Sequence, residues 1–130
     1  MAQFDKLHLG KTPFVGLDRL SHHLTYHSRR QEVIAGNLAN LDTPGYRSRD
    51  LVFHEQLNAQ IRDGEWVGDM EHREEMVTWD DEVPDQDGNT VSLERQMART
   101  AANTLRYETI SQLLSRKLTM LRYGAKDGKQ

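Results

Sequence analysis

The sequence predicts a mainly α-helical protein. Long N- and C-terminal amphipathic helices are expected to pair as a coiled-coil-like inner domain, with a short irregular or β-containing segment between them. Apolar residues recur at alternating steps of three and four near both ends of the chain, whereas the middle has no such period. The 130 residues, 36% hydrophobic and 28% charged, suffice for one modest domain but not for a thick core. We therefore expect an N-terminal helical arm (1–46), an acidic middle (47–91) and a C-terminal helix (92–130) that completes the helical domain.

The first predicted helix runs from about Phe14 to Asn40. Its heptad seam includes the polar residues His27 and Gln31, and the other positions are apolar: Leu17, Leu20, Leu24, Ile34, Leu38 and Leu41. A stripe of this kind needs a partner to cover it, because most of the stability of a helix in a protein comes from packing. We expect these apolar residues to contact the second helix or a neighbouring subunit.

The second predicted helix follows Ser92, which is a suitable N-cap, and Glu94 places negative charge in its first turn. Gly124 is a suitable terminator. The residues expected to pair with the first helix or to meet another subunit are Leu105, Ile110, Leu114, Leu118 and Leu121.

The middle segment gives weaker signals. Residues 48–66 could form a short helix with its apolar side at Leu51, Phe53, Leu57 and Ile61. Residues 65–70 and 75–83 could be two short strands, with Trp66 and Trp79 on one hairpin or on separate segments.

The segment after the first helix reads as a turn of fixed angle. Asn37 and Asn40 suit a helix C-terminus, because Asn competes for backbone hydrogen bonds and tolerates the left-handed region. Pro44 disfavours a helical Thr43 and fits the second place of a turn, and Gly45 supplies the positive φ that a type II turn needs at the third. The sequence therefore predicts a type II turn over Thr43-Pro44-Gly45-Tyr46.

This motif resembles one found in bacterial flagellar axial proteins, meaning the rod, hook and hook-associated subunits. The matching residues are Asn37, Asn40, Thr43, Pro44, Gly45 and Tyr46. Within that family, residues 29–53 and 87–124 are similar to proximal-rod subunits of the FlgB type. Together these two blocks cover about half of the chain.

The resemblance implies a structural subunit of the flagellar basal-body rod, assembled helically around the export channel to transmit torque. Its partners would be copies of itself, other rod and basal-body proteins and the flagellar export apparatus. The rod lies in the periplasmic space, and the subunit would be exported without a cleaved signal peptide, in agreement with the lack of a secretory signal pattern at residues 1–16. The alternative is a soluble cytoplasmic helical adaptor or binding module.

Two patterns match metal sites only in part. His23 and His27 are four residues apart on one helical face, but no Glu follows His23 as a metalloprotease helix requires, so polar packing is favoured. Asp85, Asp87 and Glu94 match part of a calcium loop, but Val83 stands where its first Asp is needed. We expect no metal and no cofactor.

The sequence also favours a non-enzyme. The acidic cluster Asp80, Asp81 and Glu82 has no accompanying nucleophile or oxyanion turn, and the chain has neither a Gly-x-Ser-x-Gly turn nor a phosphate-binding glycine loop. We expect no small-molecule substrate. Residues 91–130 are net basic, but these charges are scattered around the helix without a reading motif, so nucleic acid is not expected and the acidic middle of a neighbouring copy is an alternative partner.

Overall fold

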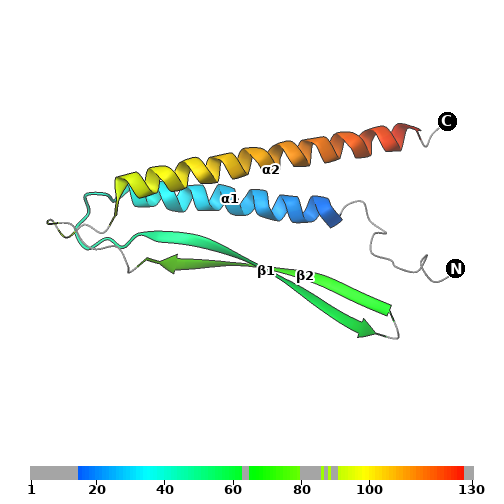
Figure 1. Cartoon of the computed structure of the whole chain (residues 1–130), viewed down its shortest axis with the longest axis horizontal. Coiled ribbons are helices and arrows are strands. Elements are labelled where there is room, and N and C mark those ends of the chain that lie inside the picture. Colours follow the sequence, from blue (N-terminus) through cyan, green and yellow to red (C-terminus); the bar gives the residue numbers. More distant parts are fainter. Residues whose placement is uncertain (1–14, 63–64, 80–85, 87, 89–90, 128–130) are drawn as a thin grey trace.

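The computed structural model describes residues 15–62, 65–79, 86, 88 and 91–127, and Figure 1 shows how their elements are arranged. In chain order these elements are α1 (Val15–Ala39), β1 (Arg49–Arg62), β2 (Glu65–Thr78) and α2 (Leu93–Asp127). The two helices run antiparallel and side by side, and the hairpin lies along the other side of α1, so α1 is the middle layer (Figure 1). The predicted class, mainly α with two long paired helices and a β-containing middle, is confirmed.

The start of α2 agrees with its sequence signals, but its end does not. The Ser92 hydroxyl accepts a hydrogen bond from the Arg95 backbone N–H at 3.4 Å, which caps the first turn. The helix continues past Gly124, which was expected to end it, as far as Asp127. Ala125 and Lys126 favour helix, and the positive charge of Lys126 suits the C-terminal end of the dipole, so one glycine is not enough to stop it.

The helix predicted within residues 48–66 is wrong, because Arg49–Arg62 form β1. The two short strands expected at 65–70 and 75–83 are instead parts of one strand, β2, which pairs antiparallel with β1 from Arg49 opposite Thr78 to Arg62 opposite Glu65. At the start of β1, Asp50 and Leu51 are both buried, Val52 and Phe53 are half-buried, and His54 is exposed. The missed signal is Asp63-Gly64, a pair typical of two-residue hairpin turns, between the two strands.

The core is small and unusually polar. Among the described residues the buried apolar side chains are Tyr26, Ile34, Leu51 and Val91. The buried polar side chains are His27, Asn37, Ser48, Asp50, Gln96 and Asn103. Because buried polar groups must be hydrogen-bonded to be tolerated, these residues decide how the helices and the hairpin fit together.

Some sequence predictions fall outside the described residues. The acidic cluster Asp80, Asp81 and Glu82 lies there, as do Val83, Asp85 and Asp87 of the partial calcium loop. Within the described part of the chain, no helix combines the length and the apolar character needed to cross a membrane.

Candidate functional site at the junction of the helices and the hairpin

The turn after α1 has the geometry that its residues require. The Tyr46 N–H donates to the Thr43 carbonyl at 3.2 Å, and Gly45 between them has a φ of +73°. These are the hydrogen bond and the third-position φ of a type II turn. Asn40 ends the helix through its side chain. Its Nδ2 donates to the Gly36 carbonyl at 2.8 Å, and its Oδ1 accepts from the Thr43 hydroxyl at 3.1 Å.

Asn37 has a different role from the helix-ending one that its sequence position indicated. It lies inside α1 and is completely buried. Its amide donates to the Arg49 carbonyl at 2.7 Å and to Gln96 Oε1 at 3.1 Å. Its Oδ1 accepts from the Arg49 N–H at 3.0 Å and from the Tyr46 hydroxyl at 3.3 Å. One side chain therefore joins α1 to the turn, to the start of β1 and to α2.

Ser48 and Gln96 extend this contact to the start of β1 and to the end of β2. Together with Asn37 they form what we call the junction cluster. Gln96 Nε2 donates to the Ser48 hydroxyl at 2.9 Å, and both residues are fully buried. The Ser48 carbonyl accepts from the Trp79 N–H at 2.9 Å, just after β2 ends. The junction cluster thus holds α1, α2 and the base of the hairpin in one arrangement.

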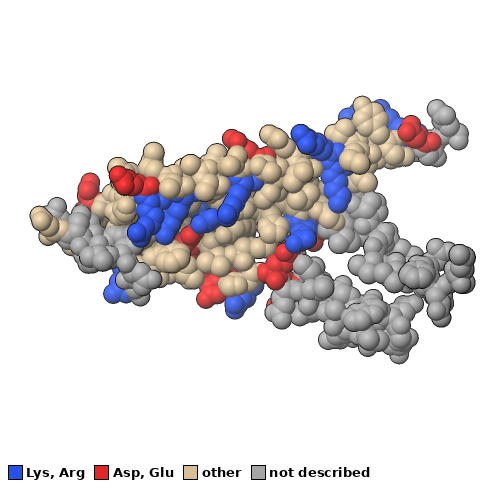
Figure 2. Space-filling model, viewed as in Figure 1, with Lys and Arg blue, Asp and Glu red and all other residues tan. Residues whose placement is uncertain are grey.

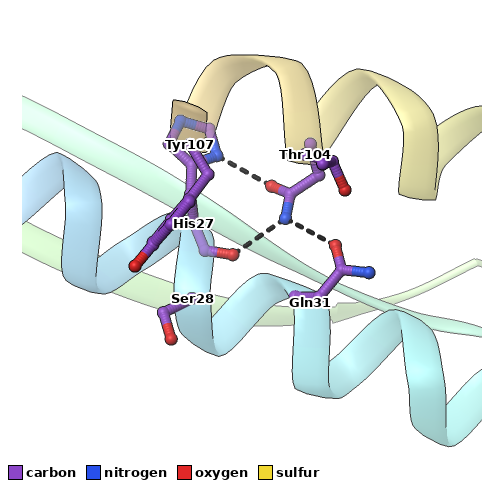
Figure 3. A pocket seen from close by; sticks show the side chains of 6 residues that line it. His27, Ser28, Gln31, Thr104 and Tyr107 are labelled. Atoms are coloured by element: carbon purple, nitrogen blue, oxygen red, sulfur yellow. Dashed lines mark hydrogen bonds between the residues drawn. The ribbon is translucent and has the colours of Figure 1, made fainter. Parts of the chain in front are cut away.

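A second polar contact joins the two helices further along (Figure 3). The Asn103 amide donates to the His27 carbonyl at 2.8 Å and to Gln31 Oε1 at 2.9 Å. Its Oδ1 lies 2.8 Å from His27 Nδ1, so a neutral His27 must carry its proton on Nδ1 and donate. Burial lowers the pKa of His27, and the positive charges of Arg106 and Arg30 act in the same direction.

The hairpin is held to α1 by a partly buried ion pair and a tyrosine. Arg30 donates two hydrogen bonds to the Asp50 carboxylate, at 2.7 and 2.8 Å. Burial by itself would raise the pKa of Asp50, but the hydrogen bonds and the charge of Arg30 outweigh it and leave that pKa below its usual value. The Tyr26 hydroxyl donates to the Leu51 carbonyl at 2.7 Å.

The apolar residues predicted for pairing divide into two groups. On α1, Ile34 is buried and Leu17, Leu20, Leu24 and Leu38 are half-buried, as is Leu41 just after the helix ends. On α2, Ile110, Leu114 and Leu121 are half-buried, whereas Leu105 is 65% exposed and Leu118 is 51% exposed. Leu105 therefore does not face α1, since it lies on the opposite side of α2 from the buried Asn103. Leu118 lies at the edge of the side that carries Asn103 and is half-exposed there.

His23 and His27, which have the spacing of two metal ligands, do not converge on one point. His27 Nδ1 bonds Asn103, while His23 Nε2 lies 3.8 Å from Glu55 Oε1 and its ring packs on Phe53. The spacing of four therefore reflects two different neighbours, one on α2 and one on β1.

Comparison with known proteins decides the family. Residues 24–47, which include the asparagines and the turn, match the family described as "Flagella basal body rod protein". The chain is 33% identical over 103 residues to the flagellar basal body rod protein FlgB of Yersinia enterocolitica, covering 66% of this chain and 75% of that protein. It is 32% identical over 100 residues to FlgB of Aquifex aeolicus, covering 74% of this chain and 81% of that protein. The chain belongs to the FlgB family of flagellar rod proteins.

This chain is accordingly a structural subunit of the flagellar basal body rod. The family match ends at residue 47, one residue before the buried Ser48. The matched residues 24–47 therefore include Asn37 and the turn. The hydrogen bonds of the junction cluster connect this segment to α2 and to the hairpin.

Sequence reasoning missed Ser48, Gln96 and Asn103. A signal was present for the last two, because Gln96 and Asn103 are seven residues apart, as are Asn103 and Ile110, on the same side of the rod subunit's second helix. Polar residues on an otherwise apolar stripe indicate a buried hydrogen-bonded contact. No comparable signal marks Ser48, whose burial depends on where α2 lies.

Proposed function

We propose that this rod subunit assembles helically around the export channel and transmits torque, in contact with copies of itself, other rod proteins and the export apparatus. An open helical assembly needs two different contact faces on each subunit, because a contact between unlike faces does not close on itself. The side of α2 that faces away from α1 supplies a candidate for one of them.

The observation that supports this proposal best is a second stripe on α2, which we call the outer stripe. It consists of exposed apolar residues spaced three, four, seven or eight apart: Ala98, Ala102, Leu105, Leu113, Met120 and Tyr123. Met120 is 74% exposed and Tyr123 is 64% exposed. Large exposed apolar side chains in register along a helix are typical of a surface that another helix covers.

Charge offers a second contact. Figure 2 shows Lys and Arg side chains gathered along the two helices on the face in view. Residues 47–90 carry thirteen acidic and four basic residues, so a neighbouring copy presents the opposite charge. Such complementarity would orient one subunit against the next.

The same proposal includes the remaining expectations from the sequence. The subunit lies in the proximal rod in the periplasmic space, is exported without a cleaved signal peptide and acts mechanically rather than as an enzyme. The six motif residues then serve to set the angle between α1 and the hairpin, while the half-buried leucines pair the helices. Family membership favours this function over that of a cytoplasmic adaptor.

The test compares Leu105→Asp with Leu105→Met. Leu105 is 65% exposed, so neither change should alter the fold of the isolated chain, and both variants should reach the export fraction. Leu105→Asp should be depleted from purified basal bodies at least tenfold relative to Leu105→Met, because a carboxylate would be buried in the subunit contact. Equal amounts of both variants in basal bodies would show that the outer stripe is not a rod contact.

A further inference from the structure

A group of ionisable side chains gathers where the N-terminal half of α1 lies against the hairpin. Asp18 and His22 are one turn apart on α1, and His72 is on β2. One possible ligand atom from each of the three lies within 4.8 Å of the other two. The group is distinct from the junction cluster and from the contact between His27 and Asn103.

The spacing of these atoms is close to that of a metal site. Zinc bonds of about 2.0 to 2.2 Å at tetrahedral angles separate two ligand atoms by about 3.4 Å. His22 Nε2 already lies 3.5 Å from Asp18 Oδ2, and both side chains are substantially exposed, at 47% and 73%. The His22 ring stacks on His72 with centroids 4.4 Å apart, so the exposed His22 would have to turn out of this stack for its lone pair to point toward the ion.

His72 has an unsatisfied nitrogen next to a suitable supporting carboxylate. Its side chain is only 12% exposed, and its Nδ1 is buried without a hydrogen-bond partner among the described residues. That nitrogen lies 3.8 Å from Glu55 Oε1, and Glu55 is held by two hydrogen bonds from Arg19 that keep its pKa below the usual value. Histidines that bind metal commonly donate their other N–H to such a carboxylate.

We propose that Asp18, His22 and His72 bind a divalent transition-metal ion, most suitably Zn²⁺, which clamps β2 to α1. Two imidazoles and one carboxylate, with water as a fourth ligand, match the usual ligands of Zn²⁺, whereas Ca²⁺ and Mg²⁺ prefer oxygen alone. Binding through His72 Nε2 would place the remaining proton on Nδ1, facing Glu55. The ion would stabilise the folded chain, because the three ligands come together only in the folded state.

The experiment uses the full-length protein without a histidine tag, stripped of metal and titrated with ZnCl₂ by calorimetry, with thermal unfolding in parallel. One Zn²⁺ per chain should bind and raise Tm. His22→Ala and His72→Ala should each weaken the affinity at least tenfold, and Glu55→Gln about tenfold.

The matched control is His54→Ala, another histidine of the same hairpin, which is paired with Glu75 at 3.0 Å and is 46% exposed. It should bind Zn²⁺ as the wild type does. His72→Ala could disturb the packing of the hairpin, so His22→Ala is decisive, because His22 is more exposed and its loss should lower the metal-free Tm less than the loss of His72. The proposal is overturned if no saturable binding occurs, if His22→Ala keeps wild-type affinity, or if His54→Ala loses as much. None of these outcomes bears on rod assembly.

Discussion

Asn37 combines two demands that a single side chain rarely meets. It sits in a helix, where its own backbone is already bonded, and it also pairs with both backbone groups of Arg49 as a neighbouring strand would. Replacement by a nonpolar residue of similar size would leave those buried groups without partners.

We therefore expect Asn37→Leu to lower the free energy of unfolding by about 3 kcal/mol, since each buried polar group left unpaired costs about 1 to 3 kcal/mol. Asn40→Ala should cost only about 1 kcal/mol, because Asn40 is half-buried and mainly caps one carbonyl. Urea unfolding of both variants measures the difference. Similar losses for the two asparagines would show that the junction cluster does not stabilise the fold.

Substitutions at Gly45 and Pro44 test whether the turn must keep its conformation. Its φ is +73°, and an added Cβ would meet no atom within 4 Å, so any penalty comes from the backbone conformation alone. Gly45→Val should cost about 1 to 2 kcal/mol, whereas Pro44→Ala should be milder because alanine can adopt the same φ.

The readout for these variants is the amount of subunit in the export fraction and in purified basal bodies. Export should survive in both, and incorporation should fail most clearly for Gly45→Val. If Gly45→Val is incorporated as well as the wild type, the conformation of the turn is not needed for rod assembly.

At the scale of the element, the pairing of α1 with α2 depends on polar contacts as well as on leucines. Leucine seams alone permit a shift of one helix along the other by a turn, whereas a buried hydrogen-bonded group is satisfied in one register only. The contact of Asn103 with His27 and Gln31 fulfils that condition.

This contact makes the helix pairing sensitive to pH. The pKa of His27 is lowered in the folded chain, so the unfolded chain binds the proton more readily and stability falls as pH drops through about 6.5. His27→Gln keeps a donor for Asn103 but does not titrate. Its free energy of unfolding should therefore depend less on pH than that of the wild type between about pH 7.5 and about pH 5.5. Parallel curves for the two proteins would exclude His27 as the source.

Gly36 offers a gain in stability within α1. A Cβ at this helical position would meet no atom within 4 Å. Gly36→Ala should therefore raise the free energy of unfolding by up to about 1 kcal/mol, through helix propensity alone. Thermal unfolding of the isolated chain measures it, and a loss of stability would mean that α1 needs the flexibility of glycine there.

At the scale of the whole molecule, α1 is the only element that contacts both α2 and the hairpin extensively within the described part of the chain. The inner side of α2 therefore serves the fold, and its outer stripe remains available to a neighbouring subunit. Two leucines of α2 allow these two roles to be tested separately, because Leu114 is half-buried against α1 and Leu105 is exposed.

Leu114→Asp should lower the free energy of unfolding by about 2 to 3 kcal/mol, because it places a carboxylate in a partly apolar contact. Leu105→Asp should change the stability of the isolated chain by about 0.5 kcal/mol or less. Denaturant unfolding of the two isolated variants checks this contrast. If Leu105→Asp destabilises the isolated chain as strongly, the outer stripe supports the fold rather than the assembly.

The sequence by itself determined the features that depend on neighbouring residues. The two helices follow from a local period, the capping of α2 from Ser92, the turn from Pro44 and Gly45, and the family resemblance from the motif that contains them. These choices need no knowledge of distant partners, because backbone sterics and capping act over a few residues.

Only the tertiary structure decided which apolar residues face inward and how the middle folds. Leu105 and Ile110 are both apolar residues predicted for the helix contact, but their burial depends on where α1 lies. α1 meets the side of α2 that carries Gln96 and Asn103. The sequence left the middle open between a short helix and two short strands, because the pairing of β1 with β2 satisfies hydrogen bonds between residues up to 29 positions apart, such as Arg49 and Thr78. The contact of Asp18 and His22 with His72 likewise exists only once the hairpin packs on α1, since nothing in the local sequence brings those residues together.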